Sequence, residues 1–124
     1  MKAIDIKVYI TYNSKMVKYI FPSWVAGVTI GNNIYFRDSE DKVSPTLLNH
    51  EMIHVCQYAD EGIENGIWKK TWADEISKFL YKYLQTSKSY RNKPSEIEAY
   101  ANEKDLNYIA TRWPQYKLEK VINN

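Results

Sequence analysis

Hydrophobic and polar positions alternate near the start of the chain, and this alternation predicts β-structure. From Ile4 to Tyr12, every second residue up to Ile10 is apolar and β-branched, which predicts a half-buried strand. Two further β-rich runs between Gly27 and Arg37 flank Gly31-Asn32-Asn33, whose tolerance of positive φ predicts a β-hairpin. The stretch from Met16 to Phe21 fits a turn or a short helix. The hairpin can be plain scaffold, or an edge strand beside a cleft that pairs with an extended peptide.

In the middle of the chain the apolar residues recur at helical spacing. Ser44 can cap a helix whose first position is Pro45. This helix is expected to run to about Asp60, with Gly62 just past its end. A second long helix is expected from Gly66 to Leu84, where aliphatic and aromatic residues repeat with the same period.

The C-terminal part is also expected to be helical. Pro94 and the acidic residues after it predict a third helix that reaches about Arg112, where Trp113-Pro114 ends it. The tail from Gln115 to Asn124 carries four apolar residues and could form one more short helix.

Length and composition narrow the classes. A chain of 124 residues, 44% apolar and 26% charged, is expected to fold as one α+β domain. Its strand-rich part would cover residues 1–43, its helical part 44–113 and its tail 114–124. A net charge of +2 gives no basis for binding nucleic acid. With no apolar run of membrane-spanning length and no signal peptide, we expect a cytoplasmic protein without a membrane partner. The single cysteine, Cys56, excludes an intramolecular disulfide and is expected to be a small buried hydrophobe.

Both histidines lie in one motif, His50-Glu51-Met52-Ile53-His54, which has the pattern H-E-x-x-H. Residues four apart share a helix face, so the two imidazoles can bind one metal ion. Glu51 can then act as a general base toward a zinc-bound water, whose pKa is about 7. A helical projection gives one polar and one apolar face: Leu47, His50, Glu51, His54 and Gln57 lie on the first, and Leu48, Met52, Val55, Cys56 and Ala59 on the second.

A catalytic zinc usually has three protein ligands and a water. No histidine remains, so a carboxylate is the expected third ligand, and the richest acidic stretch lies on the third predicted helix. Glu96 and Glu98 are two residues apart and cannot both face the metal. Glu98 is preferred because Asn102, one turn later, could hydrogen-bond a ligand histidine; Glu96 or another donor is the alternative. Glu103 and Asp105 are interpreted as surface charges.

The string His50-Glu51-x-x-His54-x-x-Gln57, a long helix and then Asn92-x-Pro94-x-Glu96-x-Glu98-Ala99-Tyr100 together resemble the gluzincins. These are zinc metallopeptidases whose third ligand is a glutamate on a separate helix. In length the chain is similar to the minimal members called minigluzincins. The resemblance implies a small zincin-like fold, in which a short antiparallel sheet or hairpin with one strand along the cleft precedes an active-site helix, a long helix and a glutamate-bearing helix. It also implies His50, His54 and Glu98 as ligands of one Zn²⁺ per chain, with Glu51 as the catalytic base.

The chain departs from the larger gluzincins in three ways. They place an acidic residue one turn after the ligand glutamate, where this chain has Asn102. They also carry a tyrosine or histidine that stabilises the oxyanion, for which Tyr83, Tyr90 and Tyr100 are the candidates. They have a second subdomain that closes the cleft. Minimal members can be held inactive by their own C-terminal segment, and the tail from Gln115 to Asn124 is long enough to fold back.

The leading prediction is a zinc-dependent endopeptidase that acts on peptides or unfolded proteins, as a monomer or a weak homo-oligomer. One alternative is a catalytically silent zinc-binding module in a zincin fold, and another is a metal-free helical binding module. Glu51 favours the enzyme, because a structural zinc site needs no base. Zinc is the expected metal, although Co²⁺, Ni²⁺ and Mn²⁺ can occupy such sites.

Overall fold

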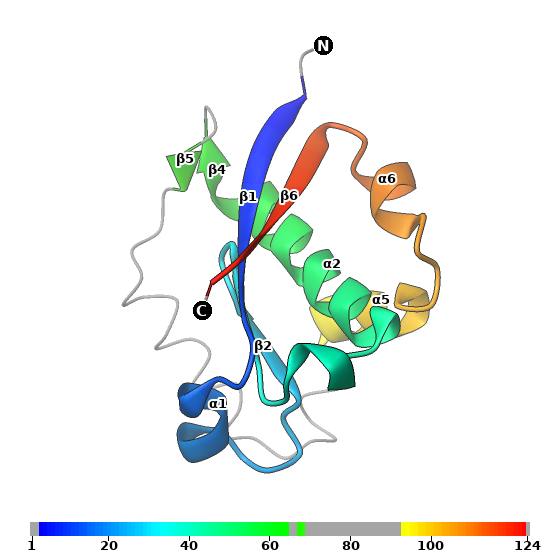
Figure 1. Cartoon of the computed structure of the whole chain (residues 1–124). Helices are drawn as coiled ribbons and strands as arrows, with labels where there is room; N and C mark the ends of the chain where they lie inside the picture. Colours follow the sequence, from blue (N-terminus) through cyan, green and yellow to red (C-terminus); the bar gives the residue numbers. More distant parts are fainter. Residues whose placement is uncertain (1–2, 65–66, 69–92, 124) are drawn as a thin grey trace.

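The computed structural model describes residues 3–64, 67–68 and 93–123 (Figure 1). It is an α+β domain in which a four-stranded mixed sheet packs against helices. In chain order the elements are β1 (Ile4–Thr11), α1 (Lys15–Ile20), β2 (Gly27–Ile30), β3 (Asn33–Phe36), the short 3-10 helix η1 (Glu40–Lys42), α2 (Pro45–Gly62), β4 (Ile63–Glu64), β5 (Ile67–Trp68), α5 (Pro94–Asn102), α6 (Tyr108–Arg112) and β6 (Tyr116–Ile122).

The strand and the hairpin expected in the first part of the chain are confirmed. β2 and β3 pair antiparallel, with Ile30 opposite Asn33, so the connecting loop has two residues. Gly31 takes a φ of 62° there, the left-handed conformation that glycine adopts without strain. The segment that fitted either a turn or a short helix is the helix α1, which Ser14 caps by accepting a hydrogen bond from the Val17 N–H.

The sheet differs from the short antiparallel sheet that was expected. Its order is β2-β3-β1-β6, and β1 runs parallel to both of its neighbours. Parallel neighbours need a long crossover, and the helical part of the chain provides it between β1 and β6. Figure 1 shows the two termini of the described chain at opposite ends of this parallel pair.

The tail was expected to be helical and is instead the edge strand β6. Tyr116 pairs with Ile4, and the pairing continues to Ile122 opposite Ile10. Tyr116 and Leu118 pack against the hydrophobic core from one side of the strand, whereas Lys117 and Glu119 are exposed. The strand is stabilised by this alternation and by backbone hydrogen bonds to β1. A short helix without such contacts would be less stable. The described tail residues therefore lie in the sheet.

Helix α2 begins at Pro45, and the Ser44 hydroxyl accepts a hydrogen bond from the Leu47 N–H at 3.0 Å, as expected for a cap. The helix contacts β2 and β3 of the sheet and also α5 and α6 of the C-terminal part. Its apolar face joins the main core with Met52, Val55 and Ala59, which pack with residues of β1 and β3. Figure 1 also shows α5 beside α2 on the side away from β1.

The third predicted helix is divided into α5 and α6. Beyond Asn102 the Asn49 side-chain amide donates hydrogen bonds to the carbonyls of Glu103 and Asp105, at 2.8 and 3.0 Å. Those carbonyls are therefore bound to α2 rather than to a continuing helix. The Asp105 carboxylate then accepts from the Asn107 N–H at 3.0 Å, immediately before α6 begins.

The helix expected from Gly66 to Leu84 lies outside the described residues, apart from Ile67 and Trp68. These two residues form β5, which pairs antiparallel with β4, so the helix does not begin at Gly66 as expected. Within the described parts of the chain, no helix has the length and apolar character needed to cross a bilayer.

Candidate metal centre

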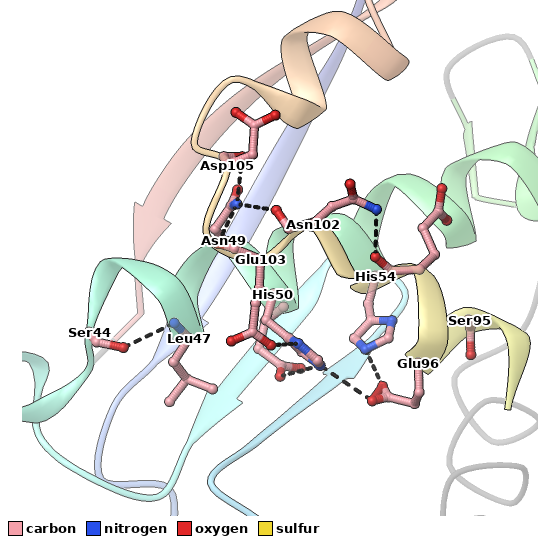
Figure 2. A network of polar contacts seen from close by, with 12 residues as sticks. Ser44, Leu47, Asn49, His50, His54, Ser95, Glu96, Asn102, Glu103 and Asp105 are labelled. Atoms are coloured by element: carbon pink, nitrogen blue, oxygen red, sulfur yellow. Dashed lines mark hydrogen bonds and ion pairs between the residues drawn. The ribbon is translucent and has the colours of Figure 1, made fainter. Parts of the chain in front are cut away.

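The two histidines of the motif project from α2 toward α5, as Figure 2 shows. His50 and His54 lie one turn apart on the helix, and their ring centroids are 4.9 Å apart in an edge-on arrangement. Both residues are buried, with 5% of the surface of His50 and 7% of that of His54 exposed. Burial of two polar rings costs free energy unless their nitrogens have hydrogen-bond or ion-pair partners. The partners of the four ring nitrogens therefore determine what the site can bind.

Helix α5 supplies the third member of the cluster, Glu96, whose side chain is completely buried. Its Oε2 lies 3.3 Å from His50 Nε2, and its Oε1 contacts His54 Nε2 (Figure 2). The three residues can each offer one ligand atom, and these atoms all lie within 4.8 Å of one another. Among the described residues, His50, His54 and Glu96 form the one group of candidate ligands that could hold a metal ion.

Glu98, the preferred third ligand from sequence, does not reach the histidines. Its Oε1 accepts from the Gln57 amide at 2.8 Å, and its Oε2 accepts from the Tyr108 hydroxyl at 2.6 Å. The physical reason is the rotation of α5 about its own axis. Ala99 packs against α2, and Glu96, three residues earlier, shares that face, whereas Glu98 is about 200° away from Glu96.

Glu103 was interpreted as a surface charge, and the structure brings it to the site. Its Oε1 lies 3.1 Å from His50 Nδ1, on the opposite side of the ring from Glu96. A signal was present in the sequence, because Glu96, Ala99 and Glu103 recur at helical spacing. A carboxylate on Nδ1 favours the tautomer that leaves Nε2 available to a metal. Asn102, expected to contact a ligand histidine, donates its side-chain amide to the Glu98 carbonyl instead.

The carboxylates around His50 dominate its electrostatics. Burial by itself lowers the pKa of His50, but hydrogen bonds to Glu96 and Glu103 and the charges of Glu51 and Glu96 outweigh burial and raise the pKa to about 9. Burial raises the pKa of Glu96, but its contacts with both histidines hold that pKa far below the usual range. Without a metal, the centre is therefore an ion pair buried between α2 and α5.

Glu51 is buried beside the cluster, with 4% of its surface exposed. The Thr29 hydroxyl donates to its Oε1 at 2.8 Å, and its Oε2 lies 4.0 Å from His50 Nε2. Thr29 belongs to β2, and sequence reasoning did not identify it, because its partner is distant in the chain. Gly27 on the same strand lets α2 approach: a Cβ there would lie 3.3 Å from Glu51 Cγ and 3.1 Å from the Phe36 ring.

A cleft of about 190 Å³ opens onto the His50 side of the cluster. The loop before β2 forms one wall of this cleft. Arg37 fixes that loop by donating to the carbonyls of Val25 and Pro22, both at 2.8 Å. The cleft is lined by Trp24, Val25, Ala26, Gly27, Ser44, Thr46, Leu47, His50, Glu51, Tyr100 and Glu103.

Cys56 is completely buried, as expected, and packs in a cluster with Ile53, Ala99 and Trp113. Burial, with the nearby charges of Asp60 and Glu98, raises the pKa of its thiol to about 12. The thiol therefore stays protonated at neutral pH and acts as packing.

Comparison with known proteins adds no further information on this centre. No family model matches the sequence, and no significant match was found among curated proteins or among solved structures.

Proposed function

We propose that the chain is a zinc-dependent metallopeptidase of the gluzincin type, with His50, His54 and Glu96 as the metal ligands. One observation carries the proposal: two histidines and a glutamate converge in a buried cluster, and a further glutamate, Glu51, adjoins them at a cleft. A set of two histidines and one glutamate is typical of catalytic zinc in peptidases.

The residues fit a metal ion. His54 Nε2 is buried and makes no hydrogen bond, although the Glu96 carboxylate lies against it. A tetrahedral zinc with bonds of about 2.0–2.2 Å holds its donor atoms about 3.4 Å apart, so the spacing within 4.8 Å needs only small side-chain movements. Three protein ligands are the number typical of a catalytic site, which keeps one position for water.

The side chains around the metal have separate roles in this proposal. When bound, zinc supplies Lewis acidity that makes a water more acidic and polarises a carbonyl. Glu51 accepts a proton at its carboxylate from the attacking water and returns it to the leaving amine. The hydrogen bond from Thr29 orients the Glu51 carboxylate, and the Glu103 contact orients the His50 ring.

Tyr100 is the tyrosine that the described site favours for stabilising the oxyanion. It lines the cleft, its ring lies 4.6 Å from that of His50, and 43% of its surface is exposed. The other candidates, Tyr83 and Tyr90, lie outside the described residues. A peptide is the proposed substrate because the cleft lies beside β2, one of the two edge strands of the described four-stranded sheet, to which an extended chain can add.

The experiment compares the wild type with Glu51→Gln, which keeps the shape of the side chain and removes the base. Zinc per chain is measured after metal-free purification and reloading, together with cleavage of unfolded casein. We expect one zinc per chain in both proteins and a loss of about 10²- to 10⁴-fold in cleavage rate for Glu51→Gln. Parallel loading with Co²⁺, Ni²⁺ and Mn²⁺ identifies the preferred metal.

One zinc per chain with no cleavage by the wild type would contradict the enzyme and support the zinc-binding module. Absence of zinc in the wild type after loading would contradict the metal centre itself. Glu119→Gln is the matched control, because it makes the same change at an exposed carboxylate on β6, outside the cleft.

A further inference from the structure

Outside the cluster, a series of hydrogen bonds leads from His54 to α6. His54 Nδ1 lies 2.7 Å from Gln57 Oε1. The Gln57 amide nitrogen donates to the Ser95 carbonyl at 2.9 Å and to Glu98 Oε1 at 2.8 Å. Tyr108 then donates its hydroxyl to the other oxygen of Glu98 at 2.6 Å.

The chemistry of these groups leaves one arrangement of the Gln57 amide. A backbone carbonyl and a carboxylate can only accept hydrogen bonds, so both must face the NH₂ group of Gln57. The amide oxygen must then face His54, and an amide oxygen can only accept. His54 Nδ1 must therefore carry a proton, so in the neutral ring that binds a metal the lone pair is on Nε2, the nitrogen that lies against Glu96.

Glu98 has a role in this series of hydrogen bonds that differs from metal binding. Both of its oxygens accept hydrogen bonds, one from α2 and one from α6, and Arg112 Nε lies 3.9 Å from Oε2. The carboxylate thus fixes the Gln57 amide in a network that ties α2, α5 and α6 together. A neutral amide in its place could donate as well as accept, so the Ser95 carbonyl would be the one remaining group of the two that requires the Gln57 NH₂.

We propose that Gln57 and Glu98 are positioning residues, which together fix the tautomer of His54 and thereby prepare Nε2 to bind a metal cation. The inference rests on the proposed metal centre and names what controls its affinity. Gln57 acts directly on His54, and Glu98 acts through Gln57. The two histidines thus have different outer partners: a carboxylate, Glu103, holds His50, and an amide held by a carboxylate orients His54.

The test measures the zinc dissociation constant of the full chain by competition with a chromophoric chelator. Gln57→Leu removes the acceptor for His54, and we expect the dissociation constant to rise about 10- to 100-fold. Glu98→Gln removes one of the two obligate acceptors of the Gln57 NH₂ group but keeps the shape and leaves the Ser95 carbonyl, so a smaller rise is expected. The double variant Gln57→Glu with Glu98→Gln exchanges the carboxylate and the amide, so His54 again faces an acceptor that is itself held by a donor. We expect this variant to recover part of the affinity, because the Ser95 carbonyl still loses its donor.

A second readout reports on the tautomer itself. In the Co²⁺-loaded protein, the ring N–H protons of the ligand histidines give shifted, exchangeable proton resonances. We expect the His54 resonance to exchange faster with water in Gln57→Leu, with the His50 resonance unchanged. A variant that only altered packing would leave both resonances as they are. Glu119→Gln on the exposed face of β6 controls for the loss of one negative charge.

Three results are separable. Zinc affinity that is equal in the wild type, Gln57→Leu and Glu98→Gln would overturn the inference while leaving the metal centre intact. A loss in Glu98→Gln as large as that in Glu96→Gln would also overturn it, because Glu98 would then act as a ligand. Affinity that depends on Gln57 in a protein that cleaves no peptide would support the inference and contradict the peptidase.

Discussion

The surroundings of the two histidines differ, although the rings are one helical turn apart. The His50 side opens to the cleft, where Tyr100, Glu51 and Glu103 surround the ring. The His54 side is closed by Gln57, which is itself held by α5 and linked to α6. Charged groups thus gather beside the cleft, and neutral or fully hydrogen-bonded groups lie where the helices are joined.

This difference indicates two tasks within one cluster. On the His50 side, Glu51, Tyr100 and Glu103 line the cleft where the proposed chemistry would take place, and Thr29 of β2 holds Glu51. On the His54 side, hydrogen bonds fix α2 against α5 and α6, so the cluster is held rigid on the side where Gln57 lies. Rigid support of this kind is what a metal site needs to keep its geometry.

Replacement of Glu96, which touches both histidines, should have the largest effect. Glu96→Gln replaces a charged metal ligand with a neutral amide. We expect zinc affinity to fall by more than the roughly 10- to 100-fold expected when a ligand loses its hydrogen-bond partner. Chelator competition measures it, and circular dichroism checks that the fold is retained. Zinc affinity close to that of the wild type would show that the third ligand is another residue.

The contacts that hold α2 against the C-terminal segment can be weakened without changing a residue of the cluster. Asp60 at the end of α2 accepts from Trp113 Nε1 and from the Tyr116 hydroxyl, both at 2.7 Å. Burial, followed by the contact with Asp60, raises the pKa of Tyr116 to about 12. Asp60→Ala leaves the buried Trp113 donor without this partner, so we expect unfolding to be easier by about 2 kcal/mol in urea titrations. Asp60→Asn keeps one acceptor and should lose less.

The cleft side can be weakened by a single hydroxyl. Thr29→Val keeps the shape and strand preference of the side chain but removes the donor to Glu51. We expect cleavage to slow about tenfold, since a hydrogen bond to a charged group is worth about 1.5–3 kcal/mol and part of this is recovered by water. Thr29→Ser keeps the donor and should be close to the wild type. Equal losses in both variants, or loss of zinc, would contradict a role on Glu51 alone.

The smallest expected effect is the release of a proton when the metal binds. The pKa of His50 near 9 in the metal-free protein means that this ring is protonated at pH 7. A metal must displace that proton, so we expect about one proton released per zinc at pH 7 and less as the pH rises above 9. Calorimetry in buffers of different ionisation enthalpy measures it. In the metal-free protein, the stabilisation from this raised pKa is present below about pH 6.5 and is lost as the pH rises through 9.

Local features were readable from the sequence because their partners are close in the chain. Ser44 and Pro45 mark the start of α2, the four-residue spacing of His50 and His54 puts them on one face, and Gly31 marks the hairpin turn. Each depends on helix or turn geometry within a few residues, which tertiary packing did not change here.

Tertiary structure alone decided which glutamate faces the histidines and what becomes of the tail. The choice between Glu96 and Glu98 depends on how α5 is rotated against α2, and the packing of Ala99 sets that rotation. β6 became a strand because β1, at the other end of the chain, offered it backbone partners. Both outcomes depend on contacts between segments far apart in sequence, whose free energy is not encoded in any short pattern.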